Sequence, residues 1–366
     1  GTTALVAAGI IAAPAMAADP ITLKLSGSMS HWAGNVDNDE TFESRAGTGV
    51  SSRAFDVKSD SEIHFSGSTK LDNGLSVSVK IELEADQQSS DGDSIDHSFM
   101  RIASPTMGAI IMGSVGGSNG VPDASYGTED ADASDWYTLP AGLTHQGEAT
   151  SRTDRTRIDY TSPSFGGFSV GLGILPELNN DLGTGVGSKL AAAGGASTAG
   201  ALAYYYKAKY TGKFSGVGLN VGYQYVNIDR NETSLTSANN SADWYENRAQ
   251  ASVSFAGFTL GGAVRDYNTD SSTSEFEGGL AYNVGIGYVT GPYEFTLTRY
   301  HSKMGGDSTV VGDDEITNTS IGIAYNMGGG VRVNAGYTDF DLTEENQTAA
   351  GKNNGSILAV GVSAAF

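Results

Sequence analysis

One segment of the chain concentrates acidic side chains and is followed at once by basic ones. Residues 116–150 are rich in Gly, Ser and Asp, and residues 151–157 read SRTDRTR, with Arg155 and Arg157 two positions apart. The acidic candidates are Asp123, Glu129, Asp130, Asp132 and Asp135. Carboxylates that face guanidinium groups across a water-filled gap sort solutes by charge and polarity. The segment therefore predicts electrostatic selection, if the fold places both groups around one gap.

Other acidic pairs offer the oxygen ligands that Ca²⁺ prefers. The candidates are Asp91 with Asp93 and Asp313 with Asp314. Neither pair lies in a run with the spacing of an EF-hand loop, and such acids are more often solvated loop residues. We therefore expect no cofactor, with structural Ca²⁺ as an open alternative.

Motifs of known catalytic chemistry are missing from the sequence. It has no Cys, its five His are scattered, and neither G-x-S-x-G nor H-E-x-x-H occurs. A hydrolase in which His64 activates a serine is the remaining enzymatic alternative, and a polar His that lines an interior is favoured over it. We expect no enzyme. The chain has 42 acidic and 21 basic residues, a net charge of −21, which argues against nucleic acid as a partner.

The first residues predict a targeting segment. Residues 1–17 are uncharged, contain a short apolar core and end in Ala15-Met16-Ala17. This pattern predicts a signal peptide cut after Ala17, with its cationic start truncated, and leaves 18–366 as the mature domain. A membrane anchor is the alternative. No later stretch of the sequence is a candidate transmembrane helix, so an exported chain is periplasmic, secreted or an outer-membrane barrel.

Beyond residue 20, apolar and polar residues alternate with a period of two, as in 75–84 and 331–338. Seven short Gly-rich turns alternate with eight long polar loops, which predicts sixteen strands. The turns are at 72–74, 104–108, 162–167, 211–216, 256–257, 291–292 and 327–330, and the loops are at 34–50, 86–94, 116–150, 177–200, 228–243, 269–274, 304–315 and 342–355. A soluble sandwich would also alternate, but short turns at one rim and long loops at the other are typical of outer-membrane barrels. The prediction is an all-β, antiparallel transmembrane barrel with short periplasmic turns and long extracellular loops, closed because lipid offers no partner to an open edge.

The same alternation predicts which charges face inward. If Ile158 and Tyr160 face lipid, Arg155 and Arg157 face the lumen, because Lys or Arg on the lipid face costs about 2–4 kcal/mol at mid-depth. The predicted basic wall is Lys58, Lys80, Arg155, Arg157, Lys207 and Arg332. Opposite the acids of 116–150 it would form an eyelet that passes small polar solutes, with a preference for cations. The alternative is a solvated acidic surface loop and arginines that pair locally.

Aromatic residues near the expected strand ends support a membrane setting. They are Tyr204, Tyr206, Tyr210, Tyr223, Tyr225, Tyr293 and Phe295. Such residues form girdles at the two interfaces of membrane barrels, although tyrosine is also common in soluble sheets.

Three stretches resemble the general-diffusion porins of Gram-negative bacteria: SEIHFSGS at 61–68, LDNGL at 71–75 and RIDYTSPSFGGF at 157–168. The resemblance implies a sixteen-stranded barrel in outer-membrane lipid that forms a homotrimer, with the third long loop folded into the pore. It also implies that Phe366 is a C-terminal assembly signal. The trimer-contact candidates that it implies lie in the last and first strands and are Ala359, Gly361, Ala364, Ala365, Leu23, Leu25 and Gly27. Two departures concern the constriction: residues 116–120 read GGSNG instead of the family's Pro-Glu-Phe-Gly-Gly, and Ser114 stands where many members carry a lumen Arg.

The resemblance implies an outer-membrane channel for passive diffusion of ions and small hydrophilic solutes. Two alternatives stay open. One is a structural or adhesive barrel whose long acidic loops bind a surface partner, and the other is a substrate-specific channel.

Overall fold

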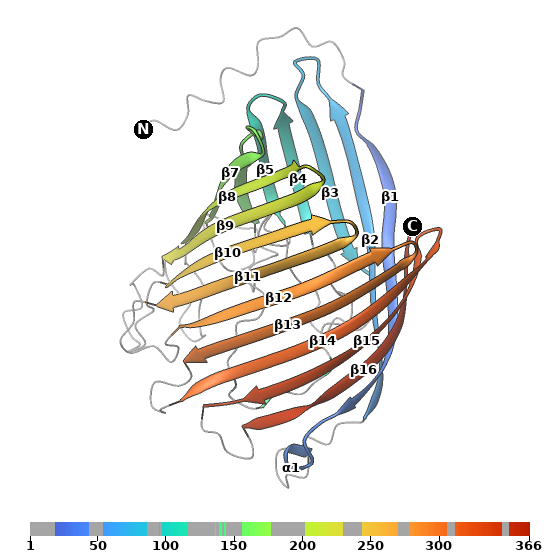
Figure 1. Cartoon of the computed structure of the whole chain (residues 1–366). Helices are drawn as coiled ribbons and strands as arrows, with labels where there is room; N and C mark the ends of the chain where they lie inside the picture. Colours follow the sequence, from blue (N-terminus) through green and yellow to red (C-terminus); the bar gives the residue numbers. More distant parts are fainter. Residues whose placement is uncertain are drawn as a thin grey trace.

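Antiparallel strands account for nearly all of the described chain and close into one barrel in the computed structural model (Figure 1). The structure describes residues 19–43, 54–85, 95, 97–115, 136, 139–140, 143, 156–176, 202–229, 244–269, 278–305, 312–345 and 351–366. The predicted signal peptide, 1–17, lies outside these residues. Among the described residues, no helix is long and apolar enough to cross a membrane.

The described residues form sixteen strands and one short helix, α1 (Glu40–Glu43). The strands are β1 (Thr22–Asp37), β2 (Phe55–Lys70), β3 (Ser76–Glu84), β4 (His97–Ser104), β5 (Gly108–Ser114), β6 (Thr156–Thr161), β7 (Phe168–Leu175), β8 (Leu202–Phe214), β9 (Val217–Asp229), β10 (Trp244–Phe255), β11 (Phe258–Thr269), β12 (Gly279–Thr290), β13 (Tyr293–Gly305), β14 (Asp313–Gly328), β15 (Val331–Thr343) and β16 (Lys352–Ala365). Each strand pairs antiparallel with the next in the chain, and β1 pairs with β16. The predicted fold class and strand number are confirmed.

The barrel closes where the first and last strands meet. Their register runs from Ser28 opposite Ala365 to Asp37 opposite Ser356. Beyond this ladder, the backbone of Gly27 exchanges two hydrogen bonds with that of Phe366, at 2.8 and 3.0 Å. A Cβ at Gly27 would lie 2.7 Å from the Phe366 ring, so glycine is needed there for the closing contact. The role of Phe366 as an assembly signal stays a prediction.

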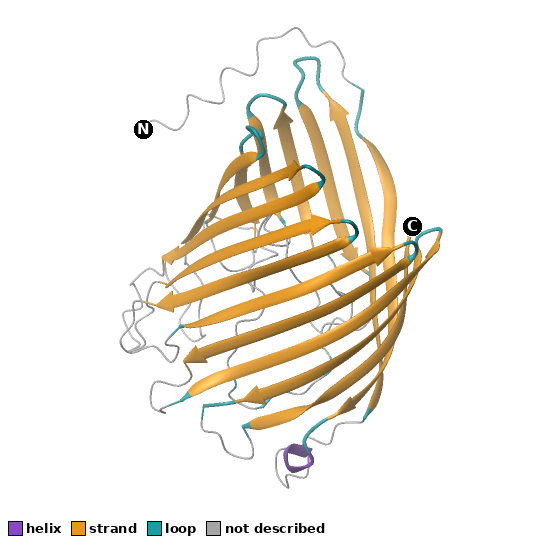
Figure 2. Cartoon of the chain, viewed as in Figure 1, coloured by secondary structure: helices purple, strands orange, loops and turns teal. Residues whose placement is uncertain are grey.

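All seven short turns predicted from the sequence are present in the described chain, and Figure 2 shows them gathered at one end of the barrel. Two of the two-residue turns join β8 to β9 and β10 to β11. There Ser215 and Gly216 have φ of 49° and 87°, and Ala256 and Gly257 have 49° and 84°. Two successive positive φ values are the geometry of a type I′ hairpin turn, whose twist matches that of the flanking strands.

Several predicted boundaries are wrong because strands are longer than expected, and three of them illustrate the difference. β1 extends into the loop expected at 34–50, β8 extends to Phe214 in the turn expected at 211–216, and β14 begins at Asp313 within the loop expected at 304–315. At such ends both faces of a strand carry polar residues, as at Asp313 and Asp314. The period-two signal disappears there although the hydrogen-bonded ladder continues.

The outer face of the barrel is an apolar band with aromatic rings near both ends of the strands. Near the short turns, Phe258 stacks on Tyr288 at 4.2 Å between ring centroids, and Tyr293 lies 5.1 Å from Tyr325. Near the long connections, Tyr206 lies 5.9 Å from Tyr204 and 6.5 Å from Tyr225. Exposed aliphatic side chains lie between these rings, among them Val170, Leu172, Ile286, Leu297 and Ile321. The arrangement matches the two interfacial girdles of a membrane barrel.

This band predicts that arginine destabilises the barrel much more at an outward position of β13 than at the adjacent inward position. Leu297 is outward and 50% exposed, whereas Thr298 faces inward. Leu297→Arg should lower the free energy of unfolding in phospholipid vesicles by about 2–4 kcal/mol, because it places a cation in hydrocarbon. Thr298→Arg, the matched control, should cost less than half as much. Equal losses in denaturant titrations would contradict the assignment of the two faces.

Candidate functional site

The inner wall carries each described basic residue that the sequence places there. Lys58 lies on β2, Lys80 on β3, Arg157 on β6, Lys207 on β8 and Arg332 on β15. They face inward because their neighbours along the strands, such as Val57, Ile81 and Ile158, are exposed on the outer surface. Arg155 and the acids Asp123, Glu129, Asp130, Asp132 and Asp135 lie outside the described residues. The role of all these residues in selection stays a prediction.

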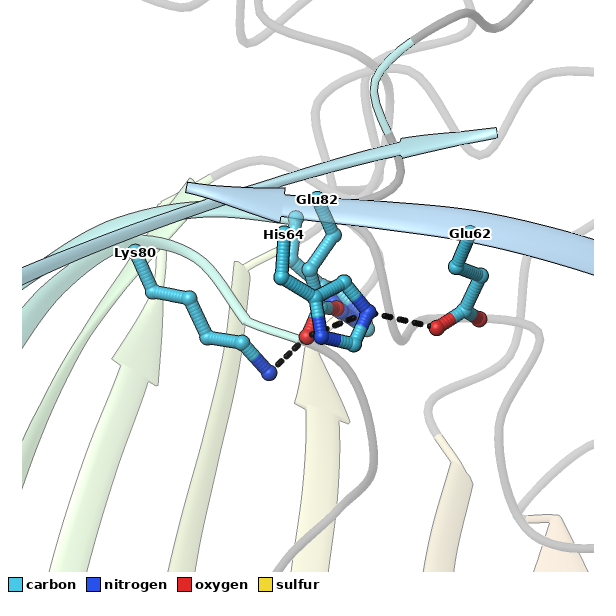
Figure 3. A network of polar contacts seen from close by, with 5 residues as sticks. Glu62, His64, Lys80 and Glu82 are labelled. Carbon is cyan, nitrogen blue, oxygen red and sulfur yellow. Dashed lines mark hydrogen bonds and ion pairs between the residues drawn. The ribbon is translucent and has the colours of Figure 1, made fainter. Parts of the chain in front are cut away.

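Glu82 is the centre of a polar network on the inner face of β2, β3 and β4 (Figure 3). It is 5% exposed and forms ion pairs with Lys80 and His97. Its Oε1 lies 3.7 Å from Nε2 of His64, and that Nε2 lies 2.6 Å from Oε2 of Glu62. Lys80 is therefore compensated by a buried carboxylate. The partners that the structure gives His64 here are carboxylates, not the serine that the hydrolase alternative requires.

The basic wall predicted from the sequence includes Lys80 but not its acidic partner. The signal for that partner is present, because Glu82 follows Lys80 by two positions and so shares its face of the strand. His97 could not be found in the same way. It reaches Glu82 from β4, across a register that only the paired strands define.

A second cluster lies on the inner face of β6 and β8. Nε of Arg157 is 3.2 Å from Oδ2 of Asp159, and both side chains are about 5% exposed. The Tyr205 hydroxyl donates a hydrogen bond to Asp159, and Nζ of Lys207 lies 5.8 Å from the centroid of the Tyr205 ring. A Cβ at Gly173 would collide with that ring. Arg157 is thus held in the wall by a buried ion pair, and breaking such a pair is strongly destabilising.

Arginine–glutamate pairs also occur on the other inner faces. Nη2 of Arg265 on β11 is 2.9 Å from Oε2 of Glu246 on β10, and Nη2 of Arg332 is 3.0 Å from Oε2 of Glu294 on β13. Across β6–β11 the inward charged residues of the described chain are Arg157, Lys207, Lys209, Lys213, Arg248 and Arg265 against Asp159 and Glu246. This half of the wall is net basic, whereas β2–β4 carry a mixture of both signs.

The inner wall is apolar toward the long connections, where the sequence leads one to expect polar residues. A buried cluster contains Trp32, Val36, Trp136, Ile316, Phe340, Leu342, Ile357 and Ala359. Trp136 and Leu143, which packs against this cluster, belong to the long segment between β5 and β6. The Trp136 ring occupies the space that a Cβ at Gly34 would need, and Nζ of Lys58 lies 5.8 Å from its centroid. These two residues of the segment therefore lie inside the barrel, as expected for a loop that folds inward.

The carboxylates proposed for calcium at Asp313 and Asp314 do not converge. The sequence places them in a loop, but they lie in β14 and so point to opposite faces. Asp313 pairs with Nζ of Lys303 at 2.8 Å, and Oδ1 of Asp314 accepts a hydrogen bond from the backbone of Glu345 at 2.8 Å. The described chain contains no group of three or more His, Cys, Asp or Glu that could hold a metal ion. Asp91 and Asp93 lie outside the described residues.

Comparisons with known proteins find porins. A family model described as Gram-negative porin matches residues 1–345. No curated protein sequence matches the chain. A refined porin structure is similar with 19% identity and a TM-score of 0.60 over 94% of this chain and 100% of that one. An anion-selective porin from Comamonas acidovorans has 15% identity and a TM-score of 0.64 over 95% and 100%. The outer membrane channel DcaP of Acinetobacter baumannii has 10% identity and a TM-score of 0.63 over 94% and 97%. At these identities the structural likeness shows the barrel fold alone.

The contact between Trp136 and Gly34 predicts strong coupling between two substitutions. Trp136→Ala should lower the free energy of unfolding by about 3–5 kcal/mol through lost burial. Gly34→Val should lower it by about 1–3 kcal/mol, because the added side chain displaces the ring. The double variant should lose at least about 1 kcal/mol less than the sum, since both changes break one contact. Ala33→Val, on the outward face of β1, replaces Gly34→Val in the control, and its loss should add to that of Trp136→Ala. Additive losses for Gly34→Val and Trp136→Ala would contradict the contact.

Proposed function

The chain belongs to the Gram-negative porin family and is a diffusion channel of the outer membrane, and from this premise we propose that a charged eyelet selects its solutes. One side of the eyelet is the basic inner wall and the other is the acidic segment 116–150. The observation that carries the proposal is the packing of Trp136, from that segment, on the inner wall beside Lys58. Asp135 directly precedes Trp136 in the chain. Opposite charges across a water-filled gap favour ions and small hydrophilic solutes over apolar ones, so no chemical step or cofactor is required.

Cation preference is the finer part of this proposal and depends on the acidic segment. The wall of β6–β11 is net basic, and by itself it would favour anions. The net charge of −21 and the acids Asp123, Glu129, Asp130, Asp132 and Asp135 support a preference of the opposite sign. We expect these carboxylates to outweigh the wall at the narrowest point.

Neutralising the five acids tests this balance. In planar bilayers with a KCl gradient, the reversal potential of the wild-type channel should show a permeability ratio of K⁺ to Cl⁻ above one. Replacing the five acids with Asn or Gln should bring the ratio below one, because the basic wall then dominates. Asp339→Asn with Asp341→Asn, two exposed positions on the outer face of β15, is the matched control. A wild-type ratio at or below one would refute cation preference, and a silent barrel would favour the structural or adhesive alternative.

We also propose that the channel is a homotrimer that associates through β1 and β2. The outward face of these strands carries polar residues within an apolar band, where lipid gives them no partner. His31 lies opposite Ser59, and Ser61, between outward Val57 and Ile63, is only 7% exposed. The contact residues suggested by the sequence are wrong for Ala359 and Gly361, because both face inward, where Trp32 lies against Gly361.

A bulky residue in this polar patch should separate the protomers. Ser59→Trp adds an apolar side chain that lipid tolerates but that a close contact between protomers does not. Native mass spectrometry in mild detergent should show a trimer for the wild type and predominantly monomer for Ser59→Trp. Val170→Trp, on the outward face of β7, should remain trimeric. A monomeric wild type would refute the proposal.

A further inference from the structure

Two glutamines on the inner wall are buried with unsatisfied amide oxygens. Gln224 on β9 is 4% exposed and Gln250 on β10 is 6% exposed. Neither Oε1 has a hydrogen-bond partner in the structure. A buried acceptor that is left unpaired destabilises the fold, and native proteins keep few such groups. Two unpaired amide oxygens on neighbouring strands indicate that a bound molecule donates hydrogen bonds to them.

The residues around these amides are cationic. The register sets Gln224 between Lys207 on β8 and Arg248 on β10. In the next inward row, Gly222 separates Gln250 from Lys209. Directly paired side chains on one face of a sheet lie about 5 Å apart at Cβ. Because Gly222 has no side chain, the space between Lys209 and Gln250 is bounded by these two residues alone within that row.

The positive charge of this wall is only partly compensated. The two inward carboxylates in the described part of β6–β11 are Asp159 and Glu246, and each already pairs with an arginine, Arg157 or Arg265. Lys209 has no ion pair with any residue in the ranges that the structure describes. An anion is therefore the group that would neutralise the lysine next to the unpaired amides.

We infer that this wall is a subsite for hydroxylated organic anions, such as sugar acids. A carboxylate or phosphate would pair with Lys209, while hydroxyl groups of the same molecule would donate hydrogen bonds to the Oε1 atoms of Gln224 and Gln250. A halide has no donor, and a neutral sugar has no charge for the lysines. The subsite rests on the proposed channel function and names one class of its solutes.

Binding in this way requires the ends of two long side chains to move. The glutamine oxygens are covered in the structure, whereas Lys207 and Lys209 are partly exposed on the inner wall. A lysine ammonium can swing toward an anion in the lumen because its four-carbon stem is flexible. Hydroxyl groups of the same ligand reach the amides only when the side chains that cover the amides also move.

The experiment measures block of the KCl current through reconstituted wild-type channels by three probes. Sodium gluconate combines a carboxylate with hydroxyl groups, butyrate has only the carboxylate, and glucose has only hydroxyl groups. Gluconate should give a saturable block with the lowest half-blocking concentration of the three. Gln224→Met with Gln250→Met should raise that concentration about three- to tenfold for each hydrogen bond lost and leave butyrate unchanged. Lys209→Gln should weaken gluconate and butyrate alike.

A matched control comes from the other side of the barrel. Asn334 on β15 is 2% exposed and its Oδ1 also has no partner, but the adjacent inward cation, Arg332, already pairs with Glu294. Asn334→Leu should leave the block by gluconate unchanged. Gluconate that blocks no better than butyrate, or an unaltered block in the glutamine variants, would overturn the subsite while the KCl current still supported the channel. A wild-type barrel without KCl current would refute the channel and the subsite together.

Discussion

Backbone groups that meet hydrocarbon must find their hydrogen-bond partners within the protein, and this requirement shapes the whole molecule. It is met here by a continuous ladder of antiparallel pairs that returns to its start, where β1 joins β16 and Gly27 exchanges hydrogen bonds with Phe366. A closed ladder leaves each strand with one face toward lipid and one toward the lumen. Charged side chains at the inward positions of the described strands line the lumen, which is how an acidic, glycine-rich sequence forms a charged passage.

Part of the inner wall keeps its charges in pairs. Glu82 compensates Lys80 and contacts His97, Asp159 compensates Arg157, and Glu246 compensates Arg265. Paired charges hold their positions, whereas free lysine ends can follow a solute. The wall therefore combines a fixed framework, anchored in the sheet, with the flexible lysine side chains of β8. Selection by such a wall depends on the uncompensated remainder and not on the number of basic residues.

Much of this architecture is predictable from the sequence because alternation is a local property. The inward positions of Lys58, Lys207 and Arg332 follow from the phase of their own strands. Partners contributed by other strands do not, since they depend on register, as His97 beside Glu82 illustrates. The apolar cluster around Trp136 also contradicts a simple polar-lumen rule, because a segment distant in sequence covers that part of the wall. The placement of Asp313 and Asp314 in a loop is wrong for a related reason. A strand that continues beyond the apolar band carries polar residues on both faces, so its sequence pattern resembles that of a loop.

Glycines at inward positions have a geometric consequence for the passage. Gly34 accommodates the ring of Trp136, Gly173 that of Tyr205, and Gly361 that of Trp32, each where a Cβ would collide. Large side chains can thus lie flat on the sheet instead of projecting into the pore. The width of the pore then depends on these glycines as much as on the residues with side chains. Replacing such a glycine by a larger residue would push the neighbouring ring away from the sheet and narrow the channel.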